Sequence, residues 1–165
     1  MLGAVGMQSA ALQANKESKN QFAAVTFARE LGERMRGNHI TAIKTAAADN
    51  PFLFDTTLAL ESDVATFAVN CFLTSCPILK DAAAWDVAEW QGRVQRALPT
   101  PRVKVCFDQN PYDSAGIARW ACTDDGDLSV LKMSWTSSNT AGSLTFAATT
   151  GIPLVVLPLT AGSSQ

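Results

Sequence analysis

The sequence has few of the residues on which catalytic and metal sites usually depend. Its one histidine is His39, and its four cysteines contain no Cys-x-x-Cys pair, so a zinc site is not expected. It also has no nucleophile elbow, no phosphate-cradling loop and no metal-ligand motif. We therefore expect neither an enzyme nor a cofactor-binding protein. His39 is interpreted as a surface or capping residue rather than a general base.

Long apolar runs are also missing. The longest, Ile152–Leu159, is interrupted by Pro153 and Pro158 and is far shorter than the ~20 residues that cross a bilayer. The net charge of -2 and the pI near 5.3 argue against a dedicated nucleic-acid binder. With 165 residues, of which 47% are hydrophobic, the chain can bury a core as a single soluble domain.

The N-terminal region has no proline before Pro51 and is rich in good helix formers. These features predict one long helix over Leu2–Arg36, ended by Gly37 and Asn38 in the left-handed conformation common at helix ends. Such a helix is about 50 Å long at roughly 1.5 Å per residue. The other ~125 residues would form a globule with a radius of gyration of only about 14 Å. One end of the helix must therefore project.

The apolar pattern indicates which end projects. One stripe repeats at helical spacing in the C-terminal half of the helix: Ala24, Phe27, Ala28, Leu31 and Met35. The same face is polar from Gln21 back to Gln13, so the stripe that faces the core stops near residue 21. A weaker stripe lies on a rotated face nearer the N-terminus: Leu2, Val5, Ser9 and Leu12. The C-terminal half is expected to pack on the domain, while the N-terminal half either frays in solution or packs against another partner.

Several charged residues of this helix are spaced for ion pairing. Glu30 and Arg34 are four residues apart in the favourable order, and Glu33 is within reach of Arg29 and of Arg36. Each such pair contributes about 0.2–0.5 kcal/mol. The pattern leaves open whether these charges stabilise the helix itself or contact another molecule.

The region after the helix has a mixed pattern. Residues 39–48 favour a short helical turn, which Asp49-Asn50-Pro51 breaks. Residues 52–60 are consistent with a loop or an irregular strand. Residues 61–73 are consistent with a short helix or an extended segment.

A second helix is predicted from the cap Asp81 through Leu98, where Pro99 stops it. Its apolar residues fall on one face, which we expect to be buried: Ala83, Val87, Trp90, Val94, Ala97 and Leu98.

The next part of the chain is expected to form antiparallel strands. Arg102–Phe107 is a β-rich run, and after a turn over residues 108–114 the segment Ile117–Cys122 is predicted to return. The chain turns again at residues 124–127. Leu128–Thr136 is the clearest strand, with alternate apolar residues on one face.

The last part of the chain predicts a hairpin. After a polar loop over Ser137–Gly142, the segments Leu144–Thr149 and Ile152–Leu157 could pair around Thr150-Gly151. Pro153 would push the second of these strands to a sheet edge. From the local patterns alone, the fold class is α+β.

Two charged clusters are compatible with more than one interpretation. Asp124-Asp125-Gly126-Asp127 is either a calcium-binding turn or an ordinary solvated turn, and it lacks the ligand spacing of an EF-hand. A basic group could meet a phosphate backbone or simply be a solvated helix end: Arg93, Arg96, Arg102 and Lys104.

The helix contains three distinctive runs: LGAVGMQ at residues 2–8, ALQAN at 11–15 and ARELGERMRGN at 28–38. A fourth run, WDVAEW at 85–90, precedes Ala97-Leu98-Pro99. Together these segments resemble PilV-type minor pilins, the modification proteins of type IV pili. The resemblance covers the helix well, the middle of the chain moderately and the C-terminal third in outline.

This resemblance implies a pilin-like α+β fold, in which a long N-terminal helix packs on an antiparallel sheet beside a second helix near residues 81–98. The chain would be one domain over residues 1–165, with a projecting helix stub at 1–21 and a globular head at 22–165. Pilins of this kind begin with a basic leader, a cleavage site and a Phe-Thr-Leu-x-Glu start, none of which is present. We therefore expect that Met1 begins a shortened, soluble chain without the membrane and filament-core segment. The Glu credited with docking subunits has no counterpart here.

The resemblance further implies a structural subunit that primes pilus assembly and lies at or near the pilus tip. Its implied partners are other minor pilins, the major pilin, a tip adhesin and, through a missing N-terminal segment, the inner membrane; nucleic acid is not expected. The head would be periplasmic before assembly and extracellular in the pilus. The implied subunit-packing residues are Leu2, Val5, Leu12 and Phe22, the last of which lies off the main stripe. A pseudopilin of type II secretion and a DNA-capturing pilin are the alternatives.

Periplasmic exposure, which the resemblance implies, favours disulfides over free thiols. Four cysteines allow three pairings. We favour Cys71–Cys76, which closes a short loop, and Cys106–Cys122, which would tie two strands. The alternative is that one or more of the cysteines are buried thiols.

Overall fold

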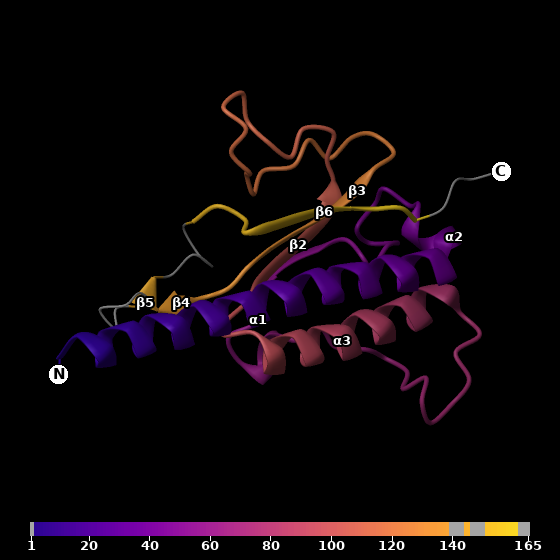
Figure 1. Cartoon of the computed structure of the whole chain (residues 1–165). Helices are drawn as coiled ribbons and strands as arrows, with labels where there is room; N and C mark the ends of the chain where they lie inside the picture. The colour runs from indigo at the N-terminus through magenta and orange to yellow at the C-terminus, as the bar shows by residue number, and fades with distance from the viewer. Residues whose placement is uncertain (1, 139–143, 146–150, 162–165) are drawn as a thin grey trace.

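A computed structural model of the chain describes residues 2–138, 144–145 and 151–161. A long helix, α1 (Leu2–Gly37), lies against one face of a four-stranded antiparallel sheet, with a second long helix, α3 (Leu79–Ala97), beside it (Figure 1). The predicted α+β class and architecture are confirmed. In the described part of the chain, no helix combines the length and apolar character needed to cross a membrane.

The long helix is confirmed, but its expected left-handed end is wrong. Gly37 is still helical, and Asn38 has φ -127° and ψ 48°. The chain does not reverse here but continues directly into a one-turn helix, α2 (His39–Ala42). The amide group of Asn38 donates instead to the carbonyl of Leu79 at 2.6 Å, which fixes the end of α1 against the start of α3.

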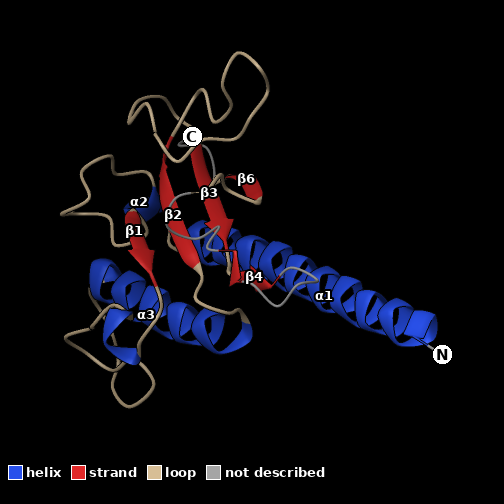
Figure 2. Cartoon of the chain, turned by 90° about the vertical axis from the view of Figure 1, so that its left-hand side faces the viewer, coloured by secondary structure: helices blue, strands red, loops and turns tan. Residues whose placement is uncertain are grey.

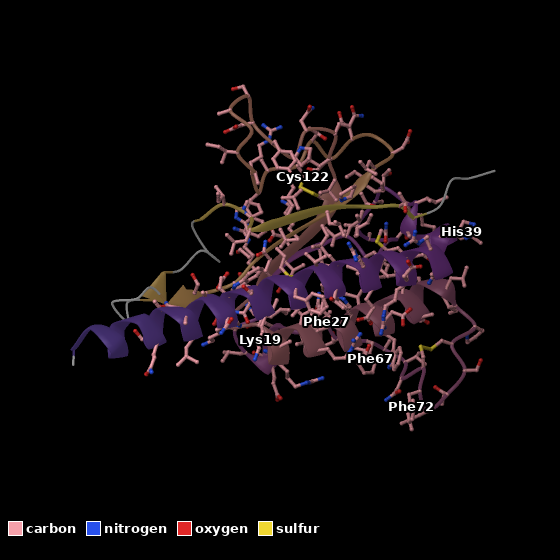
Figure 3. All side chains as sticks on the ribbon, in the orientation of Figure 1. Lys19, Phe27, His39, Phe67, Phe72 and Cys122 are labelled. Atoms are coloured by element: carbon pink, nitrogen blue, oxygen red, sulfur yellow. A yellow bond between two sulfur atoms is a disulfide. The ribbon has the colours of Figure 1, made fainter. Side chains whose placement is uncertain are left out.

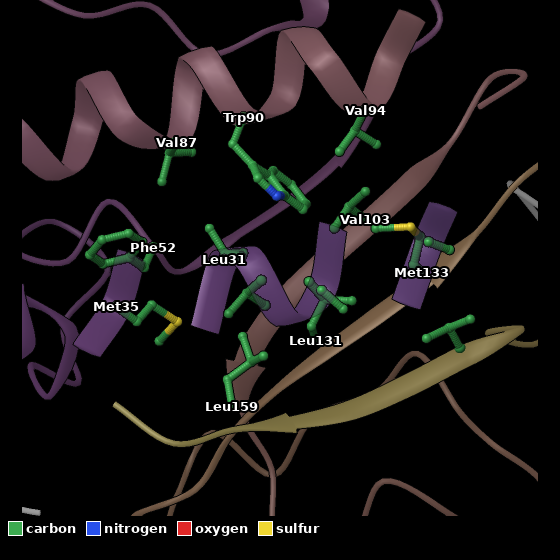
Figure 4. Packing of buried hydrophobic residues seen from close by; sticks show 14 of the residues in the cluster. Leu31, Met35, Phe52, Val87, Trp90, Val94, Val103, Leu131, Met133 and Leu159 are labelled. Atoms are coloured by element: carbon green, nitrogen blue, oxygen red, sulfur yellow. The ribbon is translucent and has the colours of Figure 1, made fainter. Parts of the chain in front are cut away.

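The predicted apolar stripe of α1 faces the core. Ala24, Ala28, Leu31 and Met35 are fully buried, and Phe27 is half-buried. Figure 4 shows Leu31 and Met35 among the side chains that fill the space between α1, α3 and the sheet. This apolar contact is what holds the C-terminal half of the helix on the head.

The second helix begins earlier than predicted. It starts at Leu79 after Ile78, so Asp81 is not its cap but lies in its first turn. The Ile78 carbonyl accepts the backbone amides of Asp81 and Ala82, which starts the helix without a side-chain cap. It ends at Ala97, one residue before the predicted Leu98, which is its C-cap. Of its predicted apolar face, all residues but Ala97, which is exposed, are buried: Ala83, Val87, Trp90, Val94 and Leu98.

The sheet has the order β1-β2-β3-β6, and every neighbouring pair is antiparallel. Its strands are β1 (Phe54–Thr57), β2 (Arg102–Phe107), β3 (Ser129–Ser134) and β6 (Val155–Leu159). β2 matches its predicted bounds, and β3 lies within the predicted Leu128–Thr136. Every residue of β3 is buried, since α1 covers one face of the sheet and the connection between β2 and β3 covers the other (Figures 1 and 2).

The predicted strand over Ile117–Cys122 is wrong. In this segment only one isolated bridge forms, between Tyr112 and Ala118. Both edges of β2 are already occupied, one by β1 and the other by β3, so a returning strand has no free edge to pair with. The segment lies instead over the face of the sheet, where the Ala121 carbonyl accepts a hydrogen bond from Lys132.

The predicted C-terminal hairpin is also wrong. Leu144–Thr145 forms β5, which pairs with β4 (Ser137–Ser138) in a separate two-stranded sheet. β6 pairs with β3 and lies at the sheet edge, as Pro153 led us to expect. The rest of the predicted polar loop, 139–142, and residues 146–150 of the predicted hairpin lie outside the described residues.

The connection between α1 and α3 is mostly irregular. The helical turn predicted over residues 39–48 is the short α2, and residues 52–60 contain β1. Within residues 61–73, only Glu61–Asp63 forms a regular element, a 3-10 turn.

Candidate assembly interface

The N-terminal half of α1 extends past the end of α3 and past the main sheet (Figures 1 and 2). The buried apolar stripe of α1 begins near residue 21, as predicted. Polar contacts with the head continue farther toward the N-terminus of the helix. The indole Nε1 of Trp135 donates to a carboxylate oxygen of Glu17 at 3.0 Å. Gln13 and Asn20, on the same side of the helix, are half-buried. The projecting segment is therefore attached to the head on one side as far as Glu17.

The other side of this segment is exposed and partly apolar. The side chain of Leu12 is 71% exposed and that of Phe22 is 77% exposed. Both belong to the predicted subunit-packing set. Leu2 and Val5, the other two members, lie on the helix, but their side chains are outside the described residues.

Five charged side chains join α1 to α3. Arg34 donates to Glu30 at 3.0 Å on its own helix, and to Asp86 at 3.0 Å and Glu89 at 2.6 Å on α3. Arg93, on α3, donates to Glu89 at 2.6 Å and reaches back to both carboxylate oxygens of Glu30. The network fixes the rotation of α3 about its own axis and its position along α1, because each arginine bridges the two helices.

The network shifts the protonation equilibria of its members. Hydrogen bonding from Arg93 lowers the pKa of Glu30, against the opposing effect of burial. Hydrogen bonding to Glu30 in turn raises the pKa of Arg93. Asp86 behaves differently, because burial raises its pKa more than Arg34 lowers it.

Sequence reasoning found only the part of this network that lies within α1. The Glu30–Arg34 pair is confirmed, and of the two arginines open to Glu33, Arg36 donates to it. The partners on α3 were missed, although Asp86, Glu89 and Arg93 recur at helical spacing on one face.

The WDVAEW segment, together with Arg93 just after it, supplies polar and aromatic contacts of α3 with α1. Besides Asp86 and Glu89, it contributes Trp90, whose Nε1 donates to the Phe27 carbonyl at 3.0 Å. The rings of Phe27 and Trp90 meet edge to face with their centroids 6.3 Å apart. The guanidinium of Arg93 lies 5.8 Å from the centre of the Phe27 ring. This segment therefore acts as the clamp that holds the head to the helix.

Both favoured disulfides are present. Cys71 is disulfide-bonded to Cys76, and Cys106 to Cys122. The Cα atoms are 5.3 Å apart in the first pair and 6.4 Å apart in the second. Because Ile117–Cys122 is not a strand, the second disulfide ties β2 to a loop rather than to another strand. None of the four cysteines is free, which indicates an oxidising, extracytoplasmic location.

A buried ion pair lies beside the second disulfide. Lys132 Nζ donates to Asp108 at 2.5 Å and to the Ala121 carbonyl at 2.6 Å, and both charged side chains are fully buried. Burial opposes ionisation of Asp108, but hydrogen bonds from Lys132 and from the backbone amide of Asn110 outweigh it and lower its pKa. Sequence reasoning missed this pair, although a lysine in the middle of a predicted core strand is a signal.

Among the described residues, one group of side chains has the spacing of metal ligands: Cys106, Asp108 and Cys122. The disulfide occupies both thiol groups and Lys132 occupies the carboxylate, so this group has no ligand atoms left for a metal.

The basic residues do not form one free patch. Arg102 and Lys104 both bind Asp55, at 3.1 and 3.5 Å, and Arg93 belongs to the network between the helices. Arg96 is exposed on the last turn of α3. Three of the four charges are thus paired with carboxylates of the fold, and of the four only Arg96 matches the expected solvated helix end.

The acidic turn and the histidine are both at the surface. Asp124 and Gly126 have positive φ angles of 53° and 84°, which is the geometry of a tight turn. Gly126 has a left-handed backbone conformation that residues with a side chain rarely adopt, which favours glycine at this position. His39 is exposed at the first position of α2.

No family model, no curated protein and no solved structure matches the chain. The architecture itself is pilin-like, with a long N-terminal helix, a four-stranded antiparallel sheet and two disulfides.

Proposed function

We propose that this protein is a minor pilin of a type IV pilus, a structural subunit that joins its neighbours through the exposed face of the N-terminal half of α1. The observation that supports this most is the exposure of Leu12 and Phe22 on a helix that projects beyond its own head. A helix in this position is expected to bury such residues against a partner.

The proposed role is assembly without bond chemistry. The subunit would associate with other minor pilins and the major pilin, prime assembly at the inner membrane, and lie at or near the pilus tip beside an adhesin. The ion-pair network and the clamp formed by the WDVAEW segment support this role, because they hold the head rigidly on the helix that would enter the filament. The disulfides fit a head that works outside the cytoplasm.

The test is genetic. Deleting the gene in the bacterium that produces the protein should reduce surface pili and twitching, and the wild-type gene should restore them. A gene with Leu12→Asp and Phe22→Asp should fail to restore them, because two carboxylates would enter the proposed subunit interface. Ile117→Asp, at a residue that is 48% exposed on the head, is the matched control and should restore pili fully.

Normal piliation in the deletion strain would contradict the priming role, and full rescue by the double variant would contradict docking through this face. The identities of proteins that co-purify with the subunit distinguish a pilus from the alternative, a type II secretion pseudopilin. Loss of protein secretion with intact pili would establish that alternative.

A further inference from the structure

The exposed face of the N-terminal half of α1 is cationic as well as apolar. Lys16 and Lys19 lie between Leu12 and Phe22 in the sequence, and both lysine side chains are exposed. Neither lysine forms an ion pair with any residue that the structure describes. The positive charge on this face is therefore not neutralised within the described part of the molecule.

The carboxylates of α1 all have partners elsewhere. Glu17 is turned toward the head, where it accepts the hydrogen bond from the indole of Trp135. Glu30 belongs to the network with α3, and Glu33 pairs with Arg36. The chain as a whole carries a net charge of -2, yet the charged side chains of α1 that lack a partner in the described chain are all cations.

The two lysines lie beside the apolar residues of the proposed docking face. A hollow of about 660 Å³ on this face is lined by six residues: Leu12, Asn15, Lys16, Ser18, Lys19 and Phe22. Leu12 and Phe22 are about 15 Å apart along the helix axis, with the two lysines between them. Figure 3 shows Lys19 near the C-terminal end of α3. A partner that covers both apolar residues therefore also covers the lysines.

Covering these lysines restricts the kind of partner that fits. Docking through Leu12 and Phe22 removes water from the ammonium groups beside them, which is unfavourable for a charge that gains no countercharge. A wholly apolar partner surface would offset none of this loss. A carboxylate within hydrogen-bond distance of each ammonium group offsets it through a charge-assisted hydrogen bond.

We infer that the partner of this face is a subunit with an acidic and apolar helix surface, whose carboxylates lie opposite Lys16 and Lys19. Because the two lysines are three residues apart, carboxylates three or four residues apart on the partner helix match their spacing. The inference rests on the proposed function, which supplies the docking face, and it adds the chemistry of the partner. The lysines then select among subunits, since a basic helix would be repelled.

The first experiment is complementation of the deletion strain. A gene with Lys16→Glu and Lys19→Glu should restore at least about 10-fold fewer surface pili than the wild-type gene, because like charges would face each other in the docked pair. Lys16→Arg with Lys19→Arg keeps both charges and should restore pili. The matched control is Lys44→Glu with Arg96→Glu, which changes the net charge equally at two exposed residues of the head and should also restore them. Circular dichroism and thermal unfolding of the purified variants establish that they are folded.

Carbodiimide cross-linking of intact pili identifies the carboxylates of the partner. This reagent joins an amine directly to a carboxylate that contacts it, without a spacer. It should yield cross-linked peptides that contain Lys16 or Lys19 and an acidic residue of another subunit. Changing that acidic residue to lysine should restore pili in the strain with Lys16→Glu and Lys19→Glu, because both charges of the contact are then reversed.

The outcomes separate this inference from the proposed function. If Leu12→Asp with Phe22→Asp fails to restore pili but the lysine-to-glutamate variant restores them fully, the subunit docks through this face and the acidic partner is wrong. Normal piliation in the deletion strain contradicts the proposed function, and this inference with it.

Anionic lipid is the other possible occupant of a basic and apolar helix face. Vesicles of phosphatidylglycerol test it with the purified protein. Binding that the lysine-to-glutamate variant loses, together with pili in which neither lysine is cross-linked to a subunit, would show that the face contacts lipid and would overturn the inference.

Discussion

The guanidinium group of Arg93, on α3, binds both carboxylate oxygens of Glu30, on α1. The two residues are 63 positions apart in the chain, and each is about two-thirds buried. This two-point pairing has a fixed geometry, because a guanidinium matches a carboxylate in one plane. The position of α3 on α1 therefore depends on how the side chains of Arg93 and Glu30 are oriented, as well as on apolar packing.

Replacing Arg93 by Gln should lower the free energy of unfolding by about 1–2 kcal/mol, since Glu30 and Glu89 would lose one of the two arginines that they share in a half-buried site. Arg93→Lys should recover only part of this, because an ammonium group cannot pair with both oxygens in the same plane. Urea titration measures the change.

Arg96 offers a matched control three residues farther along the same helix. It is exposed, so Arg96→Gln removes the same charge and should change the free energy of unfolding by no more than about 0.5 kcal/mol. Equal losses in the two variants would show that the effect is one of net charge rather than of the pairing with Glu30.

The buried pair of Lys132 and Asp108 makes a different prediction. Asp108→Asn should cost about 3–5 kcal/mol, because it leaves the buried ammonium of Lys132 without a countercharge. Adding Lys132→Met should recover most of that loss, since methionine fills the space without a charge. A double-mutant cycle by chemical denaturation measures the coupling, and additive effects would contradict it.

The sequence was sufficient for the elements whose stability is local or strongly periodic. The stripe from Ala24 to Met35 predicted which half of α1 packs on the head, and the β-rich run Arg102–Phe107 gave β2 its bounds. The pairing partners of the strands were harder to predict. Whether Ile117–Cys122 becomes a strand depends on a free edge of β2, and both edges are taken by strands that lie elsewhere in the chain.

The candidate interface was also predicted only in part from the sequence. Exposure of Leu12 and Phe22 follows from their place off the core stripe. The contact of Trp135 with Glu17 does not, because it joins residues 118 positions apart and depends on where β3 ends beneath the helix. The clamp between α1 and α3 was missed for the same reason.

Acid should destabilise the protein. Asp108 and Glu30 have lowered pKa values in the fold, so each contributes stability that is present above its unfolded pKa of about 4 and is lost as the pH falls through its folded pKa. Asp86, with a raised pKa, works in the opposite direction, since its contribution is lost as the pH rises through its folded pKa.

Because the Asp108 carboxylate is fully buried in its ion pair whereas Asp86 is partly exposed, we expect the loss to outweigh the gain, so that the free energy of unfolding falls as the pH drops below about 4. Denaturation of the wild type at a series of pH values measures the slope. The double variant Asp108→Asn with Lys132→Met should show a shallower slope, and an unchanged slope would mean that Asp108 is not one of the groups responsible.

The last prediction concerns the attachment of the projecting helix. Trp135→Phe keeps an aromatic ring in the core but removes the hydrogen bond to Glu17, so residues 8–20 of α1 should lose their polar attachment to the head. Amide hydrogen exchange should become faster in that segment, while residues 24–35, whose apolar face is buried in the core, should keep their protection. The global free energy of unfolding should fall by only about 1 kcal/mol. Trp90→Phe is the matched control, because its lost hydrogen bond is to Phe27 and its effect should fall on the packing of α3. If Trp135→Phe leaves exchange in residues 8–20 unchanged, the segment is held by its own helical hydrogen bonds and not by the head.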